Sequence, residues 1–99
     1  MEKAMLFDLG MVVSTPGALE AFQRTEEIPS DYLSRHASGN WGDLCDEDKE
    51  ANNQALGNGS RILSAYQLLD GTKIWLITDA EIDEQHHRQA TTFLLPEEY

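Results

Sequence analysis

Apolar residues fill most of the first segment of the chain and then recur at helical spacing. Residues 4–13 (AMLFDLGMVV) are apolar almost throughout and end in β-branched side chains, which predicts a strand. Gly10 lies inside this pattern, where a glycine often marks a bulge or bend, so we expect the strand to be interrupted there. A helix is predicted over residues 16–26, because Ser and Thr precede Pro16 as N-cap residues and apolar residues such as Phe22 follow on one face.

Two further helices are predicted before the pattern changes. The second begins at Pro29 and ends at Gly39, a residue type that suits the conformation after a helix. The third covers roughly residues 46–56. Its acidic start at positions 46–48 matches the positive end of the helix dipole, and the Gly-Asn-Gly run at 57–59 ends it.

After the third helix, apolar and polar residues follow an extended pattern. Strands are expected at residues 61–69 (RILSAYQLL) and 72–78 (TKIWLIT), joined by a two-residue hairpin turn at the Asp-Gly pair of positions 70–71. A polar loop at 79–89 then precedes a last strand at 90–96 (ATTFLLP).

This order of elements, β-α-α-α-β-β-β, is typical of an α+β fold. We expect a small antiparallel sheet, whose last three strands form a meander, with the helices packed on one face. The pattern does not predict where the first strand joins the sheet. The 99 residues are expected to form a single domain, 1–99, because a chain of this length has room for one core.

Cysteine usage and hydropathy bear on the compartment. No apolar run approaches the roughly 20 residues of a membrane-spanning helix. The N-terminal MEKAML lacks the basic region and the long apolar core of a signal peptide. The single Cys45 cannot form an internal disulfide, which fits a reducing interior. We therefore expect a cytoplasmic protein that does not enter a membrane.

Net charge is the most unusual property of the composition. Eighteen Asp and Glu residues against seven Lys and Arg give a net charge of −11. Direct binding to nucleic acid or to an anionic membrane is disfavoured, because both need clustered cations. Two interpretations remain. The acidic surface either imitates nucleic acid and occupies a basic groove on another protein, or it only keeps the chain in solution. Charge alone favours the second.

The acidic residues are grouped along the chain. Two short groups lie at 26–27 and 97–98. We expect two longer segments to supply the interaction surface, and their acidic residues are Asp43, Asp46, Glu47, Asp48 and Glu50 in the first, and Asp79, Glu81, Asp83 and Glu84 in the second.

A different function is suggested by Asp8, which follows a short apolar run and precedes a glycine-containing bend. Haloacid-dehalogenase-like phosphatases present their nucleophilic aspartate in this way, and Asp79 with Asp83 resembles a pair of Mg²⁺ ligands. However, Gly10 stands where the acid/base of that mechanism is needed, and the predicted strands do not build the larger parallel sheet on which that chemistry takes place. We expect no enzyme and no catalytic residue, and keep an Asp8-dependent phosphohydrolase as the remaining alternative.

Candidate metal ligands are few. His86 and His87, with Cys45 and His36, are the residues that suggest zinc. Structural zinc sites use paired ligands such as C-x₂-C, whereas adjacent histidines project in different directions. We therefore expect His86 and His87 to be solvent-facing loop residues, and we expect neither a metal nor another cofactor.

The whole chain resembles small plasmid-related proteins encoded on plasmids, integrative elements and other mobile DNA. The stretches that carry the resemblance are VVSTPGALEAF (12–22), LSRHASGNWGDL (33–44), SRILSAY (60–66), GTKIWLIT (71–78) and ATTFLLPEEY (90–99). The acidic loop before the last stretch looks longer than is usual in this group, and Asp8 is not one of its characteristic positions. The resemblance implies no catalytic residue. It implies a setting in which small acidic inhibitors of host defence complexes are found.

Two main hypotheses follow. The first is a small acidic, non-enzymatic interaction protein that binds a partner protein with a basic, nucleic-acid-binding surface, and that inhibits a host-defence complex by charge mimicry. The second is an accessory protein of mobile DNA whose acidity serves solubility and which acts as a homo-oligomer or through an unknown partner.

Overall fold

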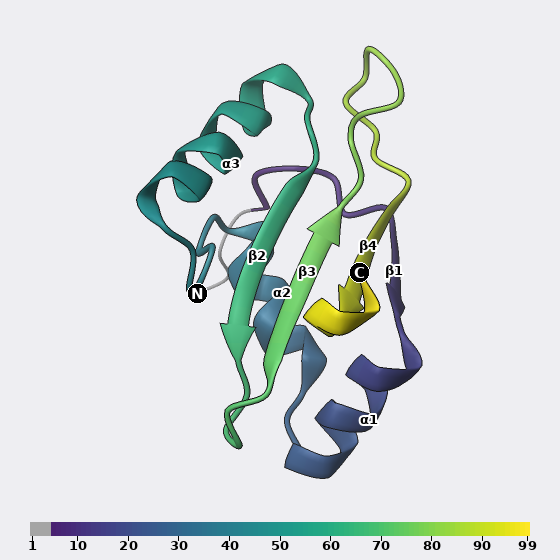
Figure 1. The fold of residues 1–99 in the computed structure, drawn as a ribbon. Coiled ribbons are helices and arrows are strands. Elements are labelled where there is room, and N and C mark those ends of the chain that lie inside the picture. Colours follow the sequence, from purple (N-terminus) through teal and green to yellow (C-terminus); the bar gives the residue numbers. More distant parts are fainter. Residues whose placement is uncertain (1–4) are drawn as a thin grey trace.

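The computed structural model describes residues 5–99, which form three α-helices, four strands and a short C-terminal 3₁₀ turn (Figure 1). The predicted order of elements is confirmed. The bounds are β1 Met11–Ser14, α1 Pro16–Thr25, α2 Pro29–Ala37, α3 Asp46–Asn58, β2 Ile62–Gln67, β3 Lys73–Thr78, β4 Ala90–Leu94 and η1 Pro96–Glu98.

The four strands form one sheet in the order β1-β4-β3-β2. The last three strands are an antiparallel meander, as predicted, and the α+β class is confirmed. The sheet as a whole is mixed, because β1 lies parallel to β4, with Met11 opposite Ala90 and Ser14 opposite Phe93. The predicted antiparallel pairing thus holds for β2, β3 and β4, and the position of the first strand, which the sequence pattern left open, is at the edge beside β4. A parallel neighbour needs a long connection, and here that connection includes the three α-helices and the strands β2 and β3.

The first strand is shorter than predicted. It begins at Met11, after Gly10, so the apolar residues of the described segment 5–10 lie outside it. Gly10 has φ +62°, and a Cβ on it would lie 2.3 Å from the carbonyl oxygen of Arg88. The glycine thus allows the chain to approach the residues before β4 closely, and it marks the start of the strand rather than a bend within it.

The helices begin where the sequence places them. Thr15 is the N-cap of α1, and its side chain accepts a hydrogen bond from Ala18 N–H at 3.3 Å. The first helix ends at Thr25, followed by the left-handed C-cap Glu26 with φ 57°, and the third continues to Asn58, two residues beyond the predicted end. The extension occurs because only Gly59, with φ 79°, adopts the left-handed conformation that ends the helix.

The hairpin between β2 and β3 has a three-residue loop instead of the predicted two-residue turn. Leu68 N–H donates to Thr72 O at 2.8 Å, and Gly71 N–H donates back to Leu68 O at 2.9 Å. Gly71 has φ +87°, whereas Asp70 has no positive φ. A type I turn followed by one left-handed glycine gives this loop, because a two-residue type I′ turn needs positive φ at both central residues.

The main core lies between the sheet and the helices α1 and α2; in Figure 1, α2 runs behind β2 and β3, and α1 lies at the lower right. Alternate strand residues such as Ile74, Leu76 and Phe93 face Phe22 of α1 and Tyr32 of α2. The helix α3 lies beside β2, where a second cluster packs Ala55 and Ile62 around Trp41. The opposite face of the sheet is covered in part by the C-terminal turn, where Tyr99 packs edge-on against Trp75.

None of the helices in residues 5–99 combines the length and the apolar character that crossing a bilayer requires.

Candidate protein-interaction surface

The first predicted acidic segment gathers around the N-terminal end of α3. We call it the α3 acidic cluster: Asp43, Asp46, Glu47, Asp48 and Glu50. All five side chains are exposed, and none forms an ion pair within the described chain. Three of them occupy the first turn of the helix, where the backbone N–H groups stabilise negative charge. The cluster is therefore an uncompensated negative surface.

In the second predicted segment, in the β3–β4 loop, the carboxylates of Glu81 and Asp83 are engaged within the protein, whereas those of Asp79 and Glu84 form no ion pair in residues 5–99. Glu81 lies 3.6 Å from the guanidinium of Arg88 and 3.0 Å from His86 Nδ1. Asp83 Oδ2 lies 2.8 Å from His87 Nδ1, and Asp83 Oδ1 accepts the backbone N–H of His87. The hydrogen bonds from His87 lower the pKa of Asp83, and the hydrogen bond to Asp83 raises the pKa of His87. These carboxylates hold the loop together.

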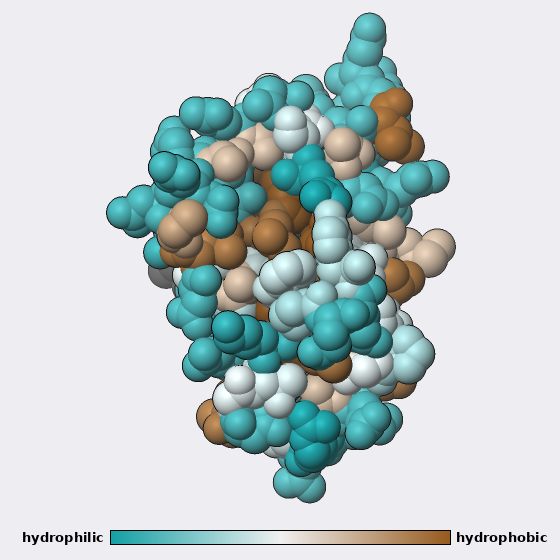
Figure 2. Space-filling view, in the orientation of Figure 1, coloured by the Kyte–Doolittle hydropathy of each residue, from teal (hydrophilic) through white to brown (hydrophobic). Residues whose placement is uncertain are grey.

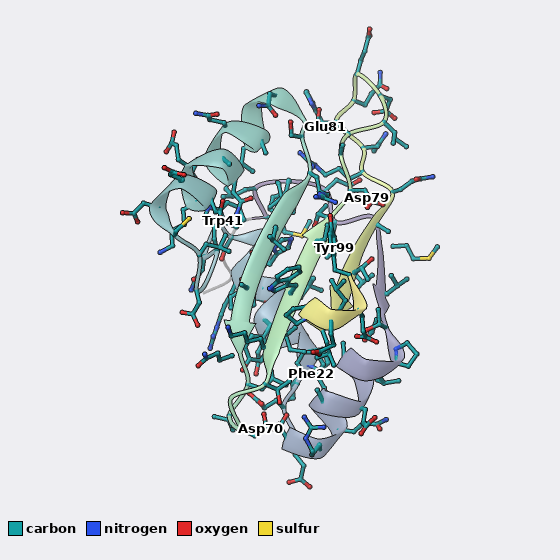
Figure 3. The ribbon with its side chains drawn as sticks, in the orientation of Figure 1. Phe22, Trp41, Asp70, Asp79, Glu81 and Tyr99 are labelled. Carbon is teal, nitrogen blue, oxygen red and sulfur yellow. The ribbon has the colours of Figure 1, made fainter. Side chains whose placement is uncertain are left out.

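The two acidic segments lie at opposite ends of α3. Glu81 N–H donates to the carbonyl of Gly59, the residue that ends α3. The α3 acidic cluster is at the other end of this 13-residue helix, which at 1.5 Å per residue is about 20 Å long. Figure 3 shows Asp79 and Glu81 together near the end of β3, away from the first turn of α3. The fold does not bring the two predicted segments into one patch.

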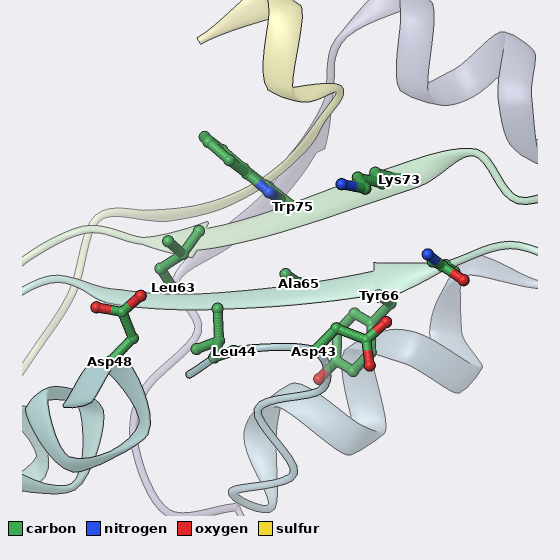
Figure 4. Close-up of a pocket in the computed structure, with 9 residues that line it drawn as sticks. Asp43, Leu44, Asp48, Leu63, Ala65, Tyr66, Lys73 and Trp75 are labelled. Atoms are coloured by element: carbon green, nitrogen blue, oxygen red, sulfur yellow. The ribbon is translucent and has the colours of Figure 1, made fainter. Parts of the chain in front are cut away.

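A groove of about 600 Å³ lies beside the α3 acidic cluster, on the open face of the sheet (Figure 4). We call it the α3–β2 groove. Its apolar residues are Leu44, Leu63, Ala65 and Trp75, and its charged residues are Asp43, Asp48 and Lys73. In the space-filling view, hydrophobic atoms show at the bottom of the hollow between α3 and the strands, and hydrophilic atoms surround it (Figure 2). The groove thus combines an apolar floor with a charged rim of two aspartates and one lysine.

The side of the groove formed by β2 is fixed by backbone pairing. Asp43 N–H donates to Ala65 O at 2.7 Å, and Ala65 N–H donates to Trp41 O at 3.1 Å. Gly42 lies between them with φ +77°, and a Cβ on it would be 1.9 Å from the carbonyl oxygen of Ala65. Only glycine permits this approach, which holds Asp43 and Leu44 at the groove.

Sequence reasoning missed the groove because its parts are separate in the chain. The residues before α3 supply one wall, and the alternate residues Leu63, Ala65 and Trp75 supply the floor. One signal was present: these positions of the strand pattern face away from the core and yet are apolar.

The predicted candidates for metal binding are dispersed. His36 is fully buried in α2, where Nδ1 is 2.5 Å from Ser64 Oγ and Nε2 is 2.8 Å from Thr78 Oγ1. Burial, with the charge of Arg88, lowers the pKa of His36 to about 4. Cys45 is exposed at the start of α3, and His86 and His87 are exposed in the β3–β4 loop. In residues 5–99, no three His, Cys, Asp or Glu side chains are arranged to hold a metal ion.

Asp8 lies before a strand and not at the end of one, which differs from the presentation that the sequence suggested. Its carboxylate accepts the backbone N–H of Arg88 at 3.0 Å and that of Gly10 at 3.3 Å. These bonds lower the pKa of Asp8, with the bond from Arg88 as the largest cause. The carboxylate thus fastens the segment before β1 to the segment before β4.

Arg88 is a buried residue that the polar composition of its loop concealed. Its guanidinium donates to Ser60 O at 2.8 Å, to Asp79 O at 3.0 Å and to Ala55 O at 3.3 Å. Because Ala55 is in the last turns of α3, the cation also meets the negative end of the helix dipole. Arg88 therefore fixes the β3–β4 loop to α3.

Comparison with protein-family models, with curated proteins and with solved structures finds no match. The resemblance to plasmid-related proteins therefore stays a prediction, and the functional argument rests on the geometry of the α3 acidic cluster and the α3–β2 groove.

Proposed function

We propose that this protein is a non-enzymatic acidic binding module, which holds a basic segment of a partner protein in the α3–β2 groove. The observation that carries the proposal is the position of the unpaired α3 acidic cluster directly beside an apolar groove. An acidic surface that served only solubility needs no apolar floor next to it.

The chemistry of the groove defines the segment that fits it. Trp75 and Leu63 offer an apolar surface for one or two side chains of the partner, and buried aromatic contacts supply much of the energy of an interface. Asp43 and Asp48 stand on the rim, where they pair with Lys or Arg on either side of that apolar contact. The net charge of −11 accelerates the encounter with a basic surface.

The partner class that we propose is a protein whose basic surface binds nucleic acid, and the acidic module competes with that nucleic acid. The mobile-DNA setting implied by the predicted family resemblance favours a component of a host defence complex.

Capture from a host lysate tests the proposal with three proteins. The first is the native chain. The second carries Asp43→Asn, Asp46→Asn and Asp48→Asn in the α3 acidic cluster. The matched control carries Glu26→Gln, Glu84→Gln and Glu97→Gln, which remove the same charge from exposed positions elsewhere.

We expect the native chain and the control to capture the same basic protein at low salt and to release it at high salt, because exposed charges are screened. The cluster variant should lose it. Nucleic acid added to the lysate should displace the partner. Equal loss in both variants would mean nonspecific charge attraction, and capture that is insensitive to salt would contradict the proposal.

A further inference from the structure

The strand β1 forms an apolar outer edge of the sheet. In Figure 1 it is the last strand on the side opposite to α3. Its apolar side chains are unusually open: Met11, Val12 and Val13 are 69, 44 and 39 % exposed. Strand residues of this type are typically half-buried. The exposure of these three side chains therefore leaves the edge available for contact.

The backbone of β1 offers unpaired hydrogen-bonding groups along this edge. Met11 N–H donates to Gln89 O and Thr15 N–H donates to Phe93 O, both at 2.9 Å. The backbone groups of successive strand residues point alternately to the two sides. Those of Val13 therefore also face β4, and the N–H and C=O groups of Val12 and Ser14 point outward. No group in the described part of the chain is hydrogen-bonded to these outward groups. Their natural complement is another strand.

The opposite edge of the same sheet is closed at Leu63 and Ala65, which makes the open state of β1 informative. Along β2, the side-chain amide of Asn52 binds both backbone groups of Leu63, and residues 41–43 bind Ala65. Natural sheets protect free edges with short strands, charged residues, prolines or covering segments. β1 is short, but its four residues include no charged residue and no proline.

Charge indicates which strand fits. Residues 9–19 carry no charged side chain, and no longer uncharged stretch occurs in this chain of net charge −11. A second copy of the chain is repelled over most of the surface but not at this edge. A basic partner, by contrast, finds no carboxylate on β1 itself, and the carboxylates at its two ends, Asp8 and Glu98, already accept hydrogen bonds from residues of the chain.

We propose that β1 pairs with β1 of a second copy, in antiparallel orientation, so that two four-stranded sheets join into one. Val12 and Ser14 carry the outward groups, so Val12 of each copy exchanges hydrogen bonds with Ser14 of the other. The two-fold axis then passes beside Val13, whose side chain meets its own counterpart. This register uses only residues of β1, and it is independent of the α3–β2 groove.

Sedimentation velocity of the native chain over a wide concentration range tests the association. We expect a concentration-dependent shift to twice the monomer mass. Val13→Glu should abolish the shift, because it places like charges directly opposite each other, whereas Val13→Thr should keep it. A native chain that stays monomeric at all concentrations overturns the proposal, and that result leaves a strand of another protein as the occupant. A Val13→Glu chain that still dimerises also overturns it.

Disulfide trapping tests the register in a Cys45→Ser background. Under mild oxidation, Val13→Cys should cross-link as a dimer, because residues that face each other in a non-hydrogen-bonded antiparallel pair have Cβ atoms about 4.5–5.5 Å apart. Val12→Cys is the matched control, because residue 12 of each copy lies opposite Ser14 of the other copy and not opposite a second cysteine. Equal cross-linking at both positions, or none at Val13, overturns the two-fold arrangement. Circular dichroism of each variant shows that it is folded.

Discussion

The side-chain amide of Asn52 in α3 binds both backbone groups of Leu63, in the way that a neighbouring strand would. Asn52 Nδ2 donates to Leu63 O at 2.6 Å, and Leu63 N–H donates to Asn52 Oδ1 at 3.2 Å. The side chain is buried, so both backbone groups of Leu63 depend on this one residue.

Replacing Asn52 with Leu should therefore destabilise the protein. The change leaves a partly buried N–H and a partly buried C=O of Leu63 without partners, and we expect the free energy of unfolding to fall by about 2–4 kcal/mol. Urea unfolding followed by circular dichroism measures it. Gln54→Ala, at an exposed position two residues after Asn52, is the control. It should change the free energy of unfolding by less than about 0.5 kcal/mol. Similar values for the two variants would show that the paired amide adds nothing.

Two glycine-to-alanine changes should have opposite effects. Gly42→Ala forces positive φ on a residue with a Cβ and pushes it into the Ala65 carbonyl, so we expect a loss of at least about 2 kcal/mol. Gly57→Ala adds a Cβ on α3 with nothing within 4 Å, so we expect a gain of about 0.5–1 kcal/mol. Thermal unfolding of both variants gives the two signs, and a stable Gly42→Ala chain contradicts the close approach.

Acid should weaken the fold in part through His36. Its pKa is about 4 in the folded protein and 6.5 when exposed, so the unfolded chain binds more protons between these values. The contribution of His36 to stability is thus fully present above pH 6.5. It is lost as the pH falls toward 4, which lowers the free energy of unfolding by on the order of 3 kcal/mol. Urea unfolding from pH 7 to pH 4 measures the slope. In His36→Gln the slope should be smaller, although the fold starts less stable, and an unchanged slope would assign it to other groups.

The aromatic floor of the α3–β2 groove provides a test that does not depend on charge. Trp75 is half-buried on the open sheet face, so Trp75→Ala removes groove surface while the main core is kept. We expect the affinity for a captured partner to fall at least about tenfold, since central aromatic residues dominate interfaces. Isothermal titration of the purified pair measures it. Leu69→Ala, an exposed apolar residue of the hairpin loop, is the control, and an equal effect at Leu69 would remove the groove from the interface.

The parts of the fold that local sequence determines could be predicted. Prolines and N-cap residues fix where α1 and α2 begin, and alternation identifies the meander. The parallel position of β1 could not be predicted, because it depends on contacts between segments that are far apart in the chain. Asn52 and Arg88 sit in polar stretches that look solvated, and their burial follows only from the partners that the fold brings to them. The groove is hidden for the same reason, whereas the exposure of the α3 acidic cluster agrees with simple composition.

The pairing of β1 with β4 has a consequence for how the chain is made. Within the described residues, the first strand to be synthesised has only the last strand as its neighbour in the sheet. The hairpin of β2 and β3 can close early, because its contacts are local, whereas β1 has no strand to pair with until β4 has been translated. During that interval the nascent chain exposes an unpaired, uncharged strand. On a polysome, β1 of one nascent chain can pair with β1 of another before its own β4 has been made. A higher expression rate should therefore increase the fraction of the protein that aggregates.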